Sequence, residues 1–145
     1  MESKITLEKY LEELEASDNS LMIYAGDELI FQSRSRGIRP HLEAIDELGE
    51  KLHGSIMVDK IVGRAAALLI LYSRASEAYT VILSGPGKNV LDDHGFDYRY
   101  IELVSHIKQK DGRIFCPFER MVQGISDPEE AYVAIVEKMA SLSSS

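Results

Sequence analysis

The sequence predicts an α/β domain with a three-layer α-β-α arrangement around a mixed β-sheet. Two short β-prone runs at 21–24 and 29–31 are separated by Gly26-Asp27, which is typical of a hairpin turn. After them, apolar strand patterns alternate with helical patterns, as expected when helices cover both faces of a sheet. Residues 65–72 form a helix that is apolar nearly all round, so we expect it to lie inside the domain.

Size and charge limit the classes of function. The chain has 145 residues and a formal net charge of −8, and we expect one domain spanning 1–145. This charge disfavours nonspecific binding to nucleic acid and to anionic membranes, which both require basic surfaces. One cysteine excludes an internal disulfide and a Cys-based zinc site, and it is typical of the reducing cytoplasm. The N-terminus lacks a signal-peptide pattern, and residues 65–72 are too few to span a bilayer.

The first half of the chain is expected to hold two amphipathic helices with the hairpin between them. Thr6 is a candidate N-cap for the first, whose apolar residues repeat at helical spacing and which ends near residue 17. A polar loop with arginines at 34, 36 and 39 follows; three basic residues there are more often solvated surface than a phosphate site. Pro40 begins the second helix, which ends at His53-Gly54.

The second half is expected to alternate between helix and strand. Asp59 is the candidate N-cap of the buried helix, and residues 79–83 form a continuous apolar strand of the kind covered on both faces. A short helix follows 84–87 and ends at Gly95; residues 98–104 form a further strand. Pro117 and Pro128 begin the last two helices, and residues 141–145 are expected to be a frayed tail.

Ligands of such sheets collect where strands end and helices begin. Three predicted helix starts qualify: Asp59 to Arg64, Ser84 to Lys88, and Cys116 to Glu119. Their backbone N–H groups carry partial positive charge, which attracts anions. At the first start, Asp59 is either a plain helix cap or a carboxylate facing a pocket, with Lys60 and Arg64 supplying positive charge. Gly63 costs a helix about 1 kcal/mol, so either a packed neighbour or a ligand needs close approach there.

The other two starts have ordinary and functional interpretations as well. Ser84 and Gly85 can present backbone N–H groups to an oxyanion, but the spacing is not that of a P-loop, and a plain strand-to-helix turn explains it equally. Cys116 precedes a helix start, where a thiol can become reactive, although a small buried apolar side chain is the commoner role. Glu119, in the same first turn, can simply favour the helix dipole. The four histidines form no metal-binding motif, so we expect no metal and no cofactor.

The chain resembles a small prokaryotic family of uncharacterised proteins with a cytidine-deaminase-like fold. The resemblance rests on Val62-Gly63-Arg64-Ala65-Ala66-Ala67, on Ser84 with the helix after it, and on Cys116-Pro117-Phe118-Glu119, and it covers roughly 20–123. Deaminases hold zinc through a His or Cys two residues before a catalytic Glu, and through a later Pro-Cys-x-x-Cys. Here the matching regions read Ile61-Val62-Gly63 and Ser84-Gly85-Pro86-Gly87-Lys88, without any of these ligands. The resemblance therefore implies the fold and not zinc-dependent deamination.

Three hypotheses about function follow. The first is that the protein binds a small anionic or nucleotide-like ligand. The residues expected to bind it are Asp59, Lys60, Gly63, Arg64, Ser84, Gly85 and Glu119. The second is an enzyme that uses Cys116 as its nucleophile, which would need a base within hydrogen-bond reach. The third is a structural or oligomerisation module without catalysis, and the resemblance implies a homodimer. The sequence does not identify a ligand or a reaction.

Overall fold

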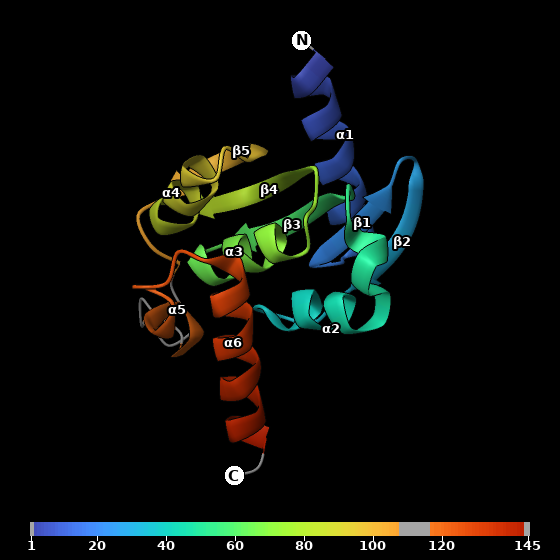
Figure 1. Ribbon diagram of the computed structural model, residues 1–145. Helices are drawn as coiled ribbons and strands as arrows, with labels where there is room; N and C mark the ends of the chain where they lie inside the picture. Colours follow the sequence, from blue (N-terminus) through green and yellow to red (C-terminus); the bar gives the residue numbers. More distant parts are fainter. Residues whose placement is uncertain (1, 108–116, 144–145) are drawn as a thin grey trace.

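The structure, a computed structural model, describes residues 2–107 and 117–143. In this part of the chain it is a mixed α/β protein with five strands and six α-helices (Figure 1). The elements in chain order are α1 (Glu2–Ser17), β1 (Leu21–Ala25), β2 (Glu28–Ser33), α2 (Arg39–Leu48), the 3₁₀ helix η1 (Gly49–Leu52), β3 (Ile56–Val62), α3 (Arg64–Tyr72), β4 (Glu77–Ser84), α4 (Gly85–Asp93), β5 (Asp97–Val104), α5 (Pro117–Met121) and α6 (Pro128–Ser143).

The strands form one mixed sheet in the order β2-β1-β3-β4-β5. The β1–β2 hairpin is antiparallel, with Leu21 opposite Ser33, and its turn contains Gly26 at φ +61° as the sequence predicted. Strand β1 also pairs antiparallel with β3, whereas β3, β4 and β5 are parallel to one another. Strand β4 therefore lies between two parallel neighbours, which explains why residues 78–80 are all buried.

The prediction that the buried helix begins at Asp59 is wrong, because this residue lies in strand β3. Residues 56–62 are extended, and α3 begins at Arg64, five residues after Asp59. Asp59 therefore caps no helix; it pairs with Leu21 on one side and with Thr80 on the other. The residues on both sides of Asp59 favour strands: Ile56-Met57-Val58 before it and Ile61-Val62 after it. The strand pattern was missed because an acidic residue interrupts it.

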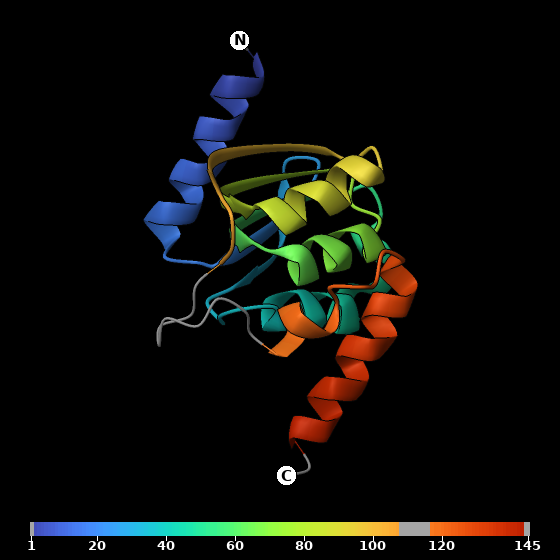
Figure 2. The same ribbon diagram turned by 90° about the vertical axis from the view of Figure 1, so that its left-hand side faces the viewer.

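The two faces of the sheet are covered by different helices (Figures 1 and 2). Helix α1 packs on one face, where Leu11 and Leu14 contact a cluster that includes Tyr24, Val58 and Tyr79. The opposite face carries the larger core, to which α3 contributes the fully buried residues 65–70. Helix α3 is enclosed by β3, α2, α4 and α6, so its lack of a polar side is explained by its neighbours.

The remaining helix ends follow local sequence signals. Ser84 caps α4 by accepting a hydrogen bond from Gly87 N, and Gly95 follows this helix at φ +62°. Asp127 accepts a bond from Glu130 N at the start of α6. Three predicted ends differ. Helix α1 begins at Glu2 rather than at Thr6, and α6 continues through Ser143 into the expected tail. Helix α2 ends at Leu48, where the 3₁₀ helix η1 replaces it, rather than at His53-Gly54. Among the described residues, no helix is long and apolar enough to cross a membrane.

Candidate functional site

The starts of α3 and α4 lie next to each other at the carboxyl ends of β3 and β4. Strands β3 and β4 are paired up to Val62 and Leu83, and each leads directly into its helix. A Cβ atom built on Gly87 would lie 3.0 Å from both the carbonyl carbon and the oxygen of Gly63. Glycine at 87 therefore allows the start of α4 to lie against the residue that precedes α3.

The carboxylate of Glu119, on α5, covers the start of α3. Its Oε1 accepts a hydrogen bond from Ala65 N at 2.8 Å, and its Oε2 accepts one from Arg64 N at 3.2 Å. These are two of the four N–H groups that a helix start leaves without an internal partner. Glu119 thus caps α3 although it lies 55 positions after Arg64 in the chain. The positive, N-terminal end of the α3 dipole further stabilises the negative carboxylate.

Gly63 makes this contact feasible. A Cβ atom at position 63 would lie 2.5 Å from Glu119 Oε1 and 3.0 Å from its Cδ. No real Cβ approaches another atom so closely, so any side chain here would push Glu119 off the helix. The sequence placed Gly63 inside the buried helix, but Gly63 precedes α3 as its N-cap residue, in an extended conformation. The group that approaches it closely is the Glu119 carboxylate.

Burial raises the pKa of Glu119 above its ordinary value of 4.5. The hydrogen bonds from Ala65 and Arg64, together with the charges of Arg64 and His106, act in the opposite direction without cancelling the effect of burial. Glu119 also lies near the C-terminal ends of β3 and β4. Carboxyl groups whose pKa is raised by burial occur in binding and catalytic sites, and also at some positions with a purely structural role.

The Arg64 side chain points away from this carboxylate toward the connection between α5 and α6. Its Nε donates to Val122 O at 2.8 Å, and its Nη2 donates to Ile125 O at 2.6 Å. Arg64 therefore anchors the segment that carries Glu119, and its guanidinium is already occupied by backbone carbonyls.

Ser84 and Gly85 lie at the same edge as Glu119. The Ser84 hydroxyl is buried and accepts from Gly87 N at 3.0 Å. Gly85 is beside the end of β5, where an added Cβ would be 3.7 Å from Ser105 O, an ordinary contact distance. The structure thus brings Gly63, Arg64, Ser84, Gly85 and Glu119 into one region.

Asp59 and Lys60 lie away from this region. Asp59 is 6% exposed, and its Oδ2 is 2.7 Å from Nε2 of His41, a residue of α2 that is itself 1% exposed. Lys60 pairs with Asp18 near the end of α1, at 3.9 Å. The two residues stand five and four positions before α3 in the chain, within a strand, so they are removed from the helix start that they were expected to serve.

His41 is a buried polar residue that sequence reasoning missed. Its Nδ1 has no hydrogen-bond partner among the described residues. No local pattern marks it, because its partner Asp59 is 18 positions away. Cys116 lies outside the described residues. Within 2–107 and 117–143, no three His, Cys, Asp or Glu side chains are grouped so that they could hold a metal ion.

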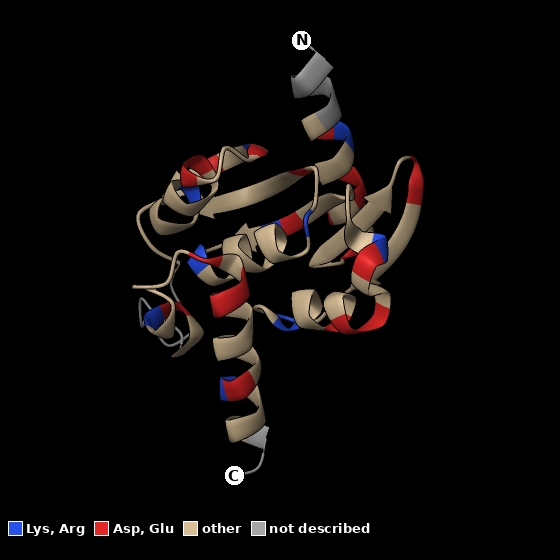
Figure 3. Ribbon diagram, viewed as in Figure 1, with Lys and Arg blue, Asp and Glu red and all other residues tan. Residues whose placement is uncertain are grey.

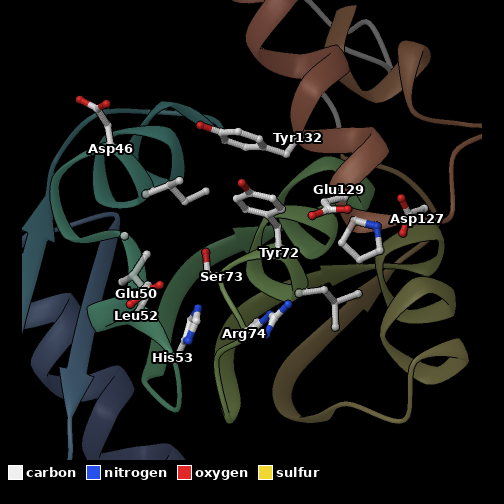
Figure 4. A pocket seen from close by; sticks show the side chains of 14 residues that line it. Asp46, Glu50, Leu52, His53, Tyr72, Ser73, Arg74, Asp127, Glu129 and Tyr132 are labelled. Carbon is white, nitrogen blue, oxygen red and sulfur yellow. The ribbon is translucent and has the colours of Figure 1, made fainter.

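A separate cavity of about 740 Å³ lies between η1, the end of α3 and the start of α6 (Figure 4). Titratable side chains from α2, η1, α6 and the adjoining connections line it: Asp46, Glu50, His53, Arg74, Asp127 and Glu129. The rings of Tyr72 and Tyr132 stack at its wall, with centroids 4.1 Å apart and an interplanar angle of 8°. Burial raises the pKa of Tyr132, and Tyr72 and Asp46 raise it further. Sequence analysis singled out none of these residues.

The fold and this edge define a mixed α/β protein whose buried central helix is capped by a distant carboxylate. The chain belongs to the TM1506 family, described as a domain of unknown function (DUF1893), whose model matches residues 9–139. It is similar to the crystal structure of a DUF1893 family protein (TM1506) from Thermotoga maritima, with 32% sequence identity and a TM-score of 0.82. The likeness covers 91% of this chain and 88% of that one. Among curated proteins, no sequence matches the chain.

Proposed function

We propose that the protein binds a small anionic or nucleotide-like ligand at the edge where α3 and α4 begin. The observation that carries this proposal is the contact of Glu119 with the N–H groups of Arg64 and Ala65, at 3.2 and 2.8 Å. These two donors already hold one carboxylate. A ligand with a carboxylate or phosphate offers them the same acceptor chemistry, so it can take the place of the Glu119 side chain.

The state of Glu119 favours such an exchange. Burial raises its pKa, which means that the ionised side chain is held in surroundings less favourable than water. Moving this carboxylate into solvent restores its hydration, while the incoming anion takes over the two hydrogen bonds. Helix α5 has only five residues and none of them is fully buried, so its displacement disturbs little of the core.

The other residues of this edge have separate roles in the proposal. Gly63 has no side chain to block approach to the start of α3, and Gly87 lets the start of α4 lie beside it. Ser84 and Gly85 flank the position from the α4 side. Arg64 holds the α5–α6 connection through two carbonyl contacts and does not meet the ligand's charge. Asp59 and Lys60 take no part.

We also propose that the arrangement is the three-layer, cytidine-deaminase-like one, acting without zinc and in the cytoplasm. Helices on both faces of a mixed sheet support this assignment, as does the position of α3 after a parallel strand. The absence of a His, Cys or Glu from residues 61–63 argues against deamination by the zinc mechanism.

The test compares the wild-type chain with Glu119→Ala in the presence of AMP, CMP and inorganic phosphate, by thermal shift and calorimetric titration. We expect at least one of them to raise the melting temperature of the wild type at millimolar concentration. Glu119→Ala should bind the same compound about tenfold more tightly, because the internal competitor is gone.

Glu12→Ala is the matched control, since Glu12 is exposed on α1 and far from α3 in the chain. It removes the same charge and should leave binding unchanged. If none of the three compounds stabilises either the wild type or Glu119→Ala, the proposal is wrong.

A further inference from the structure

We propose that the cavity between η1, the end of α3 and the start of α6 is a second site, which binds an organic cation of the polyamine type. The cavity measures about 740 Å³, within the range of small-molecule sites in proteins. It is separate from the α3–α4 edge, because it lies at the opposite, carboxyl end of α3, where Tyr72 and Arg74 stand. The inference therefore does not depend on the proposed function.

The charge of the cavity wall selects a cation. Four acidic residues line it, Asp46, Glu50, Asp127 and Glu129, together with one arginine, Arg74, and one histidine, His53. Figure 3 shows acidic residues both on α2 and in the first turns of α6, the elements on opposite sides of this cavity. Across the described residues, no ion pair within 4.0 Å involves Asp46, Glu50, Glu129 or Arg74. The acidic residues of the wall therefore outnumber its one arginine, and none of them is held in a close ion pair within the described residues.

Helix capping explains only half of these carboxylates. Asp127 accepts a bond from Glu130 N, and it and Glu129 favour the positive end of the α6 dipole. Asp46 lies in the last turn of α2, where the helix dipole is negative and where α2 has no basic residue. Glu50 follows in η1. An acid at this position opposes the helix dipole, and a bound cation would remove that cost.

Two further features of the wall suit an amine. The carboxyl end of α3 borders the cavity, and the carbonyl groups at a helix end attract cations. Tyr72 and Tyr132 stack on each other at the wall, and the faces of aromatic rings attract cations. Figure 4 shows the Tyr132 ring above the Tyr72 ring, with Glu129 next to Tyr72, Asp127 farther along and Arg74 below.

The chemistry favours an extended organic amine over a metal ion. Within the described residues, no three ligating side chains are grouped closely enough to hold a metal. The carboxylates are instead spread over α2, η1 and the start of α6. A molecule with several ammonium groups separated by methylene chains can meet such dispersed charges one by one.

Spermidine binding, followed by calorimetric titration, tests the proposal. We expect saturable binding to the wild-type chain that weakens as salt is added. The double variant Asp46→Asn/Glu50→Gln should bind spermidine at least about tenfold more weakly. Glu47→Gln is the matched control, since Glu47 is exposed on α2 and does not line the cavity; its affinity should stay within about twofold of the wild type.

A variant that is expected to tighten binding, rather than weaken it, makes the test independent of folding defects. Arg74 has φ +58°, a conformation that glycine adopts without strain, so Arg74→Gly is expected to fold. It removes the cation from the wall and should tighten spermidine binding about fivefold. Glu119→Ala should leave this affinity unchanged, which separates this site from the one at the α3–α4 edge.

Three results would overturn the proposal: no spermidine binding at about 1 mM, an equal loss of affinity in Glu47→Gln, or no gain in Arg74→Gly.

Discussion

Nε2 of His41 lies 2.7 Å from Oδ2 of Asp59, and both side chains are almost fully shielded from solvent. The pair joins α2 to the central strand β3 inside an otherwise apolar region. A buried polar group that loses its partner has no water to replace it, so the cost of breaking this contact is high.

We therefore expect Asp59→Ala to destabilise the protein by about 2–5 kcal/mol in urea unfolding. Asp18→Asn serves as its control, because it removes the charge while asparagine, like aspartate, tolerates the φ of +61° at this position. Asp18 is exposed, and its contact with Lys60 is a surface pair at 3.9 Å, so its loss should cost at most about 1 kcal/mol. Equal effects of the two substitutions would mean that the buried pair contributes nothing beyond a surface one.

The contact between Gly63 and Glu119 predicts strong coupling between two substitutions. Gly63→Ala alone should destabilise the chain by about 1–3 kcal/mol, because its Cβ would take the place of Glu119 Oε1. In a Glu119→Ala background the same change should cost much less, since the obstacle is gone. Gly124→Ala, at a position with open space around it, controls for the loss of glycine. Additive effects in this double-mutant cycle would contradict the contact.

The raised pKa of Glu119 predicts a specific dependence of stability on pH. Since the folded pKa lies above 4.5, the folded state binds a proton more tightly than the unfolded chain does. The stability that Glu119 contributes is thus fully present below about pH 4.5 and is lost as the pH rises through the folded value. The unfolding free energy of the wild type minus that of Glu119→Gln should therefore increase on acidification. A difference that decreases instead would show that hydrogen bonding outweighs burial.

A homodimer remains a prediction of the sequence, and the edge strand β5 offers a place for it. Ile101 and Leu103 on this strand are 61% and 47% exposed, and within the described part of the chain β5 pairs with β4 alone. We expect light scattering to give twice the mass of one chain, and Ile101→Lys to lower it toward that of a monomer. A wild-type monomer at working concentration would contradict the prediction.

Local patterns in the sequence located most elements because their causes are local. Gly26-Asp27 makes a hairpin turn, Ser84 and Asp127 are followed by helices that they cap, and the apolar run 79–83 lies in β4, between two parallel neighbours. Strand β3 escaped prediction because Asp59 resembles a helix cap when its neighbours in space are unknown. Its partner His41 comes from another element, so no spacing in the sequence connects them.

The candidate site shows the same division. The sequence marked the starts of α3 and α4 and the close approach at Gly63, because glycine in a strong helix pattern and polar residues before apolar ones are local signals. It could not show that Glu119 fills the α3 start, that Arg64 is held by Val122 and Ile125, or that Lys60 meets Asp18. The sequence also could not show the cavity beside Tyr72 and Tyr132, because the wall of this cavity is formed by segments that are far apart in the chain.

The sequence by itself determined the α/β class, the hairpin and a buried helix without a polar side, and its missing ligands argue against zinc-dependent deamination. Those properties depend on periodicity, turn chemistry and the presence of particular residue types. Only the tertiary structure decided what meets the start of α3 and where Asp59 lies. Hydrogen bonds between residues 18 or 55 positions apart depend on how the elements pack, and no local pattern encodes them.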